Sequence, residues 1–217
     1  MRIADRARRL WYRLRRAQQV RQIEHLQAAG MRIGRNVVLM DDVVLDSSVP
    51  WLIEIGDYCR LSSGTRVMAH DATTYLDLGV TRIAPVRILA GSFIGERTLI
   101  LPGVTIGPRT MIAAGSVVNR DIPEGMIAAG NPARPYGRLD EMLARIARMA
   151  SEGWIVSSED INNGAVTPAR IHEAMAQGRE IFVTRQDPVS PYHVNLDRAS
   201  LEKQVREAFA THFGAPR

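Results

Sequence analysis

The residue in this sequence best suited to acid–base chemistry is His70, the only histidine between residues 31 and 134. An imidazole ionises near neutral pH and can therefore withdraw a proton from a hydroxyl group as that group attacks an electrophile. A working imidazole is usually held by an acceptor on its other ring nitrogen. Asp71, the next residue along the chain, is a candidate for that acceptor, and it is equally well explained as a solvated turn residue.

The elements that must position His70 are predicted by a repeat of six residues. A large apolar residue returns at every sixth position, without a slip, at Ile88, Ile94, Ile100, Ile106, Ile112 and Val118. The same period occurs upstream, with a break near Pro50 and Trp51, at Ile33, Leu39, Leu45, Ile55, Leu61 and Val67. A period of six fits neither a helix nor an alternating strand. It predicts short strands joined by tight corners, with three hexapeptides to a coil and residues eighteen apart stacked about 4.8 Å from each other.

Two further positions of the hexapeptide support this coiled arrangement. The residue four after each apolar one is usually small or β-branched. Cys59 holds such a position, which favours a buried small hydrophobe over a reactive thiolate. Glycine often follows the apolar residue, as at Gly95, where a corner needs backbone freedom. The longest interruption of the repeat, between Val67 and Pro85, carries His70, and a polar loop inserted in a solenoid disturbs no core contact.

The composition is that of an ordinary globular protein. Hydrophobic residues make up 46% and charged residues 24% of 217 residues, with a net charge of +5. A single cysteine cannot form an internal disulfide, so a cytoplasmic location is expected. The sequence has neither a run of about 20 apolar residues nor the apolar core of a signal peptide. No nucleic-acid partner is expected.

Three segments are expected along the chain: an N-terminal amphipathic helix at 1–30, a repeat domain at 31–138 and a C-terminal helical or α/β extension at 139–217. The first helix, residues 1–29, is rich in arginine and ends at Gly30. We expect it to pack on its own solenoid or on a neighbouring subunit, with peripheral contact to anionic lipid as the alternative. The extension is expected to form helices at 165–177 and 198–213 and a strand at 180–184.

A family resemblance is carried by the run from Pro85 to Gly107 (PVRILAGSFIGERTLILPGVTIG) and by the closing motif Gly130-Asn131-Pro132-Ala133-Arg134. Both are similar to the closing half of hexapeptide-repeat acetyltransferases, a family that includes maltose, galactoside and serine acetyltransferases and sugar O-acetyltransferases of polysaccharide pathways. The resemblance covers roughly residues 31–138. It implies a β-solenoid, a left-handed parallel β-helix, which departs from the usual right-handed crossover.

The resemblance also implies an activity. An acetyl group would pass directly from acetyl-CoA to a hydroxyl of a sugar acceptor within a ternary complex, with His70 as general base. The enzyme would be a homotrimer with its sites between adjacent solenoids. Some relatives carry an asparagine one coil before the histidine, and the matching position here is Met40, so the pattern departs there. Asp41, which follows Met40, is a candidate substitute that would contact the histidine or the acceptor, and it is equally well explained as a solvated corner residue. Residues at positions that contact acetyl-CoA in the family are Phe93, Ala114, Asn119, Arg120 and Arg134.

Other functions compete with this one. An N-acetyltransferase of an amino sugar or nucleotide sugar would use the same fold, and so would a non-catalytic solenoid scaffold. A zinc carbonic anhydrase family shares the architecture, but its metal needs three imidazoles and the repeats contain only His70, so no metal site is expected.

Overall fold

The computed structural model describes residues 20–184 of the chain. These divide into two compact units, with the boundary between Tyr136 and Gly137. Each unit is described by itself.

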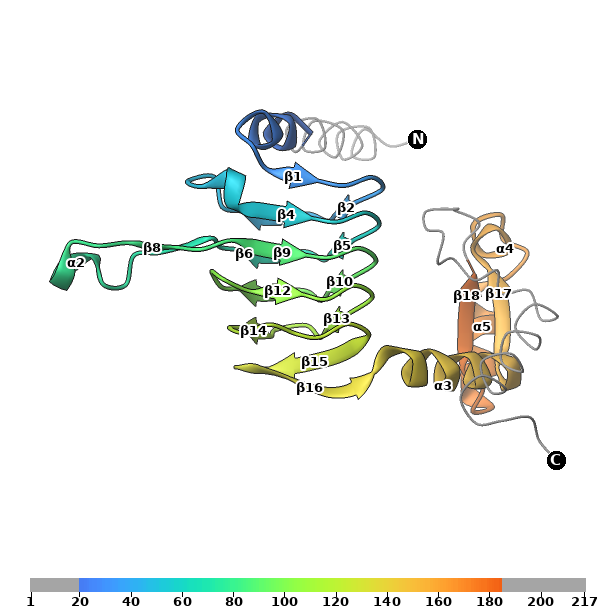
Figure 1. The fold of residues 1–217 in the computed structure, drawn as a ribbon. Coiled ribbons are helices and arrows are strands. Elements are labelled where there is room, and N and C mark those ends of the chain that lie inside the picture. Colours follow the sequence, from blue (N-terminus) through green and yellow to red (C-terminus); the bar gives the residue numbers. More distant parts are fainter. Residues whose placement is uncertain (1–19, 185–217) are drawn as a thin grey trace. The chain divides into compact units, whose positions relative to one another are not determined.

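The first unit is a coil of short strands that belong to three sheets (Figure 1). Sheet A contains β1 (Arg32–Ile33), β4 (Ile53–Ile55), β9 (Val86–Ile88) and β12 (Thr105–Ile106). Sheet B contains β2 (Val38–Leu39), β5 (Arg60–Leu61), β10 (Phe93–Ile94), β13 (Met111–Ile112), β15 (Met126–Gly130) and β16 (Ala133–Arg138). Sheet C contains β3 (Val44–Leu45), β6 (Arg66–Val67), β11 (Leu99–Ile100) and β14 (Val117–Val118). The chain visits sheets A, B and C in turn, and every printed pairing between successive coils is parallel.

The strand register confirms the predicted coil of eighteen residues. Ile94 pairs with Ile112, and Ile100 pairs with Val118. The second residue of each two-residue strand points inward, because neighbouring side chains in a strand point to opposite faces. All six members of the unbroken repeat are fully buried: Ile88, Ile94, Ile100, Ile106, Ile112 and Val118. One apolar row on each sheet therefore forms the interior of the coil.

Buried hydroxyl groups occupy the corners between the sheets. Most of the small residues at the fifth hexapeptide position are buried as predicted, including Ser92, Thr98 and Thr110, while Val37 and Val43 are partly buried. The Ser92 hydroxyl donates to the carbonyl of Gly107 at 2.8 Å, and the Thr110 hydroxyl donates to that of Pro123 at 2.9 Å. Because a buried hydroxyl without a partner is costly, these bonds allow polar residues inside the corners.

Gly95 shows how closely successive coils approach each other, and it provides a test of the coil. A Cβ atom on Gly95 would lie 2.4 Å from the backbone nitrogen of Ala114. We expect Gly95→Ala to lower the free energy of unfolding by about 3 kcal/mol in urea titrations, because the backbone must shift. Gly137→Ala is the matched control, since its Cβ would meet no atom within 4 Å. Equal unfolding midpoints for the two variants would contradict the close stacking.

A helical segment precedes the coil. Residues 20–28 are helical, Leu26 is buried, and the helix ends at Gly30, whose φ of 99° is a conformation that favours glycine. The predicted helix therefore ends where expected, while its residues 1–19 lie outside the described part of the chain.

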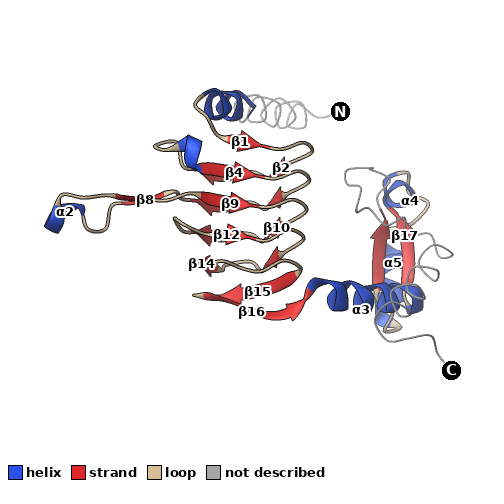
Figure 2. Cartoon of the chain, in the orientation of Figure 1, coloured by secondary structure: helices blue, strands red, loops and turns tan. Residues whose placement is uncertain are grey.

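Two insertions interrupt the coil on the way from sheet C to sheet A (Figures 1 and 2). The first contains a short 3₁₀ helix, η1 (Pro50–Leu52). The second forms an arm that projects from the coil, and we call it the finger (residues 70–83). Its base is the antiparallel pair β7 (His70–Asp71) and β8 (Arg82–Ile83), and its tip carries α2 (Tyr75–Leu78). All of residues 71–83 are exposed.

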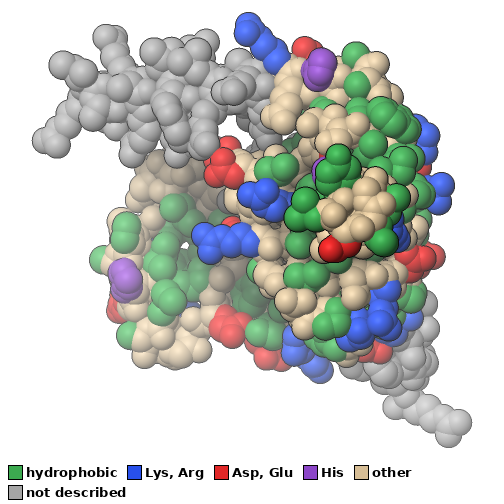
Figure 3. Space-filling view, turned by 90° about the vertical axis from the view of Figure 1, so that its left-hand side faces the viewer, with side chains coloured by type: hydrophobic (Ala, Val, Ile, Leu, Met, Phe, Trp, Pro, Cys, Tyr) green, Lys and Arg blue, Asp and Glu red, His purple; other side chains and the backbone are tan. Residues whose placement is uncertain are grey.

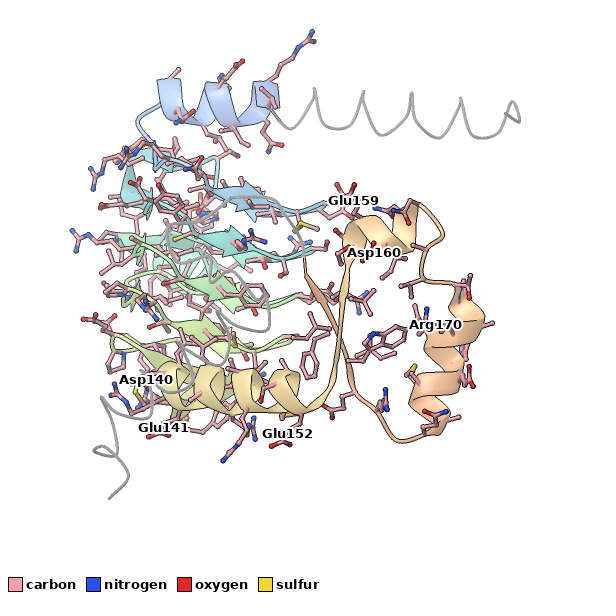
Figure 4. The ribbon with its side chains drawn as sticks, turned by 90° about the vertical axis from the view of Figure 1, so that its right-hand side faces the viewer. Asp140, Glu141, Glu152, Glu159, Asp160 and Arg170 are labelled. Atoms are coloured by element: carbon pink, nitrogen blue, oxygen red, sulfur yellow. The ribbon has the colours of Figure 1, made fainter. Side chains whose placement is uncertain are left out.

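In residues 137–184, the described part of the second unit, there are three helices and a two-stranded parallel sheet (Figure 4). Its elements are α3 (Leu139–Glu152), β17 (Trp154–Ser157), α4 (Ser158–Asn162), α5 (Pro168–Ala176) and β18 (Ile181–Thr184). The Ser157 hydroxyl caps α4 by accepting the Asp160 N–H, and the Arg170 guanidinium lies 5.7 Å from the centre of the Trp154 ring. The predicted helix at 165–177 and strand at 180–184 correspond to α5 and β18, and the predicted helix at 198–213 lies outside the described residues. Among residues 20–184, no helix has both the length and the apolarity to cross a bilayer.

Candidate active site

His70 lies where the chain leaves sheet C for sheet A. We call this side of the coil corner CA (residues 46–52, 68–85, 101–104 and 119–121), and the turn from sheet B to sheet C corner BC (residues 40–43, 62–65, 95–98 and 113–116). His70 begins the finger, three residues after β6 ends at Val67. Its side chain is 29% exposed, so it is accessible from solvent while being held by its surroundings.

A buried carboxylate, Asp46, holds His70. The Asp46 side chain is 2% exposed, and its Oδ2 atom lies 2.5 Å from Nδ1 of His70. The same oxygen accepts the backbone N–H groups of Ala69 at 3.0 Å and His70 at 3.1 Å, and Oδ1 accepts the N–H of Ser48 at 2.9 Å. Four donors from two successive coils therefore converge on one carboxylate.

This arrangement determines which imidazole nitrogen is available. Burial alone would raise the pKa of the Asp46 carboxyl, but the hydrogen bonds from Ser48, His70 and Ala69 outweigh burial and hold the pKa below its ordinary value. An ionised carboxylate can only accept, so Nδ1 of His70 carries the hydrogen that the contact requires. In the neutral imidazole the Nε2 atom then has the free lone pair that a general base needs.

The acceptor of the imidazole is therefore Asp46 and not Asp71 or Asp41, the two residues expected from the sequence. Asp71 follows His70 in strand β7, so its side chain points to the opposite face of the finger base. It accepts the backbone N–H and the hydroxyl of Thr73, and these bonds lower the pKa of Asp71. Asp41 lies in corner BC, and sheet C separates that corner from His70.

A register signal could have identified Asp46 from the sequence. Leu45 of β3 pairs with Val67 of β6, so Asp46 opens corner CA one coil before the segment that carries His70. Their separation of 24 positions obscures this relation, because η1 lengthens the corner that lies between them.

The positions expected to contact acetyl-CoA do not gather around His70 within one chain. Asn119 and Arg120 are exposed in corner CA, two coils beyond His70. Ala114 is exposed in corner BC, and Phe93 is a partly exposed residue on the outer face of sheet B. The exposed Arg134 in β16 donates to the carbonyl of Ala133 at 2.7 Å. His70 and Ala114 thus lie on opposite sides of sheet C.

Cys59 has the properties of a structural residue. Its side chain is fully buried, its thiol lies 3.1 Å from the Leu89 carbonyl, and burial raises the pKa of the thiol. A thiol in this state is a poor nucleophile. Within residues 20–184, no group of three or more His, Cys, Asp or Glu side chains is arranged to hold a metal ion.

Comparison with known proteins locates the repeat. The family model for the bacterial transferase hexapeptide, in six repeats, matches residues 85–120. YvoF of Bacillus subtilis (strain 168), named for a proposed acetyltransferase activity, is 33% identical over 120 residues, which are 55% of this chain and 67% of that protein. Protein CapG of Staphylococcus aureus is 31% identical over 135 residues, which are 58% of this chain and 77% of CapG.

Solved structures include similar coils. A maltose O-acetyltransferase from Clostridium difficile 630 matches with a TM-score of 0.43 and 24% identity, over 52% of this chain and 72% of that one.

Proposed function

Because the chain belongs to the hexapeptide-repeat acetyltransferase family, we propose that it moves an acetyl group from acetyl-CoA to a hydroxyl of a saccharide, with His70 as general base. The observation that carries the proposal is the contact between His70 and Asp46, which leaves Nε2 free to accept a proton. The coil is proposed to be left-handed, as in the family.

The reaction would proceed in one complex without an acyl-enzyme. Nε2 of His70 takes the proton of the acceptor hydroxyl as that oxygen attacks the thioester carbonyl. The tetrahedral intermediate collapses with cleavage of the carbon–sulfur bond, and the coenzyme A thiolate receives the proton from the imidazolium. Asp46 stabilises the imidazolium while it exists, because its negative charge is 2.5 Å away and largely shielded from water.

The outer faces of the sheets support a trimeric assembly. Sheet A is polar outside, with Glu54 bonded to Arg32 at 2.6 Å and close to Arg87 at 3.7 Å. The outer rows of the other two sheets each combine three apolar residues with one arginine: Val38, Arg60, Phe93 and Met111 on sheet B, and Val44, Arg66, Leu99 and Val117 on sheet C. Contact through sheets B and C would cover these rows. In such a trimer, as in the family, His70 of one chain and Ala114 of the next would serve one site.

Ala114 tests where acetyl-CoA lies. Small residues in the last coils would let the pantetheine arm lie against the backbone, and Ala114 is exposed there. We expect Ala114→Trp to weaken acetyl-CoA binding at least about tenfold by calorimetry, with a normal unfolding midpoint. Leu143→Trp, at an exposed position of helix α3, is the control for an added indole. Unchanged affinity for acetyl-CoA would show that the channel lies elsewhere.

Mixed assemblies test whether two chains share a site. At limiting acetyl-CoA, His70→Ala and Ala114→Trp should each have strongly reduced activity alone, but co-expression should restore part of the activity. A site that takes His70 from one chain and Ala114 from the other can then be intact. If the co-expressed mixture stays as inactive as its components, the two residues serve the same site from one chain.

An acceptor screen tests the activity itself. Thiol release from acetyl-CoA should require one member of a panel of sugars, amino sugars and nucleotide sugars. Hydroxylamine cleaves esters far faster than amides, so the product distinguishes transfer to oxygen from transfer to nitrogen. Absence of both acetyl-CoA binding and thiol release would favour a non-catalytic scaffold.

A further inference from the structure

The residue opposite His70 in the base of the finger is Ile83. Strands β7 and β8 run antiparallel, and they pair His70 with Ile83 and Asp71 with Arg82. Residues that pair directly across two strands place their side chains on the same face, and the next pair along the strands uses the other face. The finger base therefore has two faces, one with His70 and Ile83 and the other with Asp71 and Arg82.

A backbone hydrogen bond shows how close the side chains of His70 and Ile83 come. The N–H of Ala84 donates to the carbonyl of Ala69 at 3.0 Å, which makes these two residues a hydrogen-bonded pair. Hydrogen-bonded and non-hydrogen-bonded pairs alternate along an antiparallel ladder, so His70 and Ile83 form a pair of the second kind. The Cα atoms of such a pair are about 4.5 Å apart, and its side chains are closer than those of a hydrogen-bonded pair. Ile83 is thus a direct neighbour of His70.

The side chain beside the candidate base is apolar and open to solvent. The coil covers Asp46 almost completely, but it leaves Ile83 54% exposed. Figure 3 views the side from which the finger projects, and hydrophobic side chains gather over it. Ligand sites typically combine apolar surface with a few polar groups that fix the orientation of the ligand. Ile83 and the imidazole form such a combination.

The ligand that fits this position is the acceptor. Its reacting hydroxyl must meet Nε2 of His70, so the atoms next to that hydroxyl come within reach of the cross-strand neighbour of His70. The positions expected to contact acetyl-CoA do not compete for this place within the chain, because sheet C lies between Ala114 and His70.

We propose that Ile83 contacts an apolar part of the acceptor next to the reacting hydroxyl, and so selects saccharides that present C–H surface there. This inference rests on the proposed function. Two kinds of saccharide offer such surface: a 6-deoxyhexose through its methyl group, and a hexose through the C–H face of its ring. Burial of one methylene group is worth about fourfold in affinity, so an aliphatic side chain can discriminate between acceptors.

Two variants of nearly the same shape separate apolarity from size. Ile83→Val and Ile83→Thr differ in a methyl group against a hydroxyl. Acetyl transfer by the full chain is measured with L-fucose and L-galactose, L-rhamnose and L-mannose, and D-fucose and D-galactose, since the members of each pair differ only at C6. We expect Ile83→Thr to raise the acceptor KM about tenfold or more, and Ile83→Val about fourfold or less. The kcat should stay within about twofold, because the contact is the same before and during the reaction.

Val80→Thr is the matched control, because Val80 is 53% exposed in the same finger but lies outside the β7–β8 pair. A preference for 6-deoxy sugars that Ile83→Thr reduces would identify the methyl group as the bound surface. Equal use of both members of a pair, with the same rise in KM, would identify the C–H face.

The inference is overturned if the KM of Ile83→Thr matches that of Ile83→Val or of the control. It is also overturned if Ile83→Thr lowers kcat alone, weakens acetyl-CoA binding, or changes the oligomeric state, since these results assign Ile83 to the imidazole, the donor or a second copy of the chain. In each of these cases thiol release with a sugar leaves the proposed function standing. Absence of thiol release with every sugar would remove the proposed function, and this inference with it.

Discussion

His70→Ala is expected to lower kcat by about 10²- to 10⁴-fold, the usual contribution of a general base, while the Kd for acetyl-CoA stays within about twofold. The fold should persist, because the Asp46 carboxylate still accepts hydrogen bonds from the backbone N–H groups of Ser48, Ala69 and residue 70 after the imidazole is removed. Steady-state kinetics, calorimetry with acetyl-CoA and an unfolding curve measure these three quantities.

The control for this variant is His172→Ala, since His172 is an exposed histidine of α5 in the other unit. It should leave kcat unchanged. A His70→Ala enzyme with normal turnover would remove His70 from the reaction. A variant that had lost acetyl-CoA affinity and turnover together would instead indicate a binding role for the imidazole.

Asp46→Asn should lower kcat by about 10²-fold, because an amide holds the imidazolium less well than a carboxylate does. It should also lower the free energy of unfolding by about 1–3 kcal/mol, since a buried donor loses its acceptor. Asp46 accepts through both oxygens, from Ser48 on one and from Ala69 and His70 on the other. Either orientation of an asparagine amide sets its NH₂ group against one of these N–H donors.

The pH dependence of unfolding separates this role from simple packing. The folded-state pKa of Asp46 is lowered, so its carboxylate contributes stability above the ordinary aspartate pKa and loses that contribution as pH falls through the lowered value. In Asp46→Asn, the loss of unfolding free energy at acid pH should therefore be smaller than in the wild type. Asp42→Asn, an exposed corner aspartate, should leave both kcat and the His70-dependent pH–rate profile unchanged. An Asp46→Asn enzyme with the wild-type pH–rate profile would contradict positioning of His70 by Asp46.

The interior of the coil could be predicted from the sequence because each hexapeptide places one apolar side chain in the same interior. After three hexapeptides the chain returns to the same sheet, so Ile94 and Ile112 stack. This stacking follows from the repeat alone and needs no contact with a remote part of the chain. The candidate base could be predicted for a related reason. His70 lies in the longest break of the pattern, where a loop replaces no core contact.

The hydrogen-bond acceptor of His70 could not be predicted from the sequence in this way. Sequence proximity favoured Asp71 and the family resemblance suggested Asp41, yet strand alternation turns Asp71 away from His70 and sheet C separates Asp41 from it. Asp46 contacts His70 because the strands that precede them stack, Leu45 on Val67, and both residues then enter the same corner. By itself the sequence determined the period, the buried rows and the one imidazole in the coil. Only the tertiary structure decided which charged side chain contacts that imidazole. Residues meet where successive coils stack at the same corner, whatever their separation along the chain.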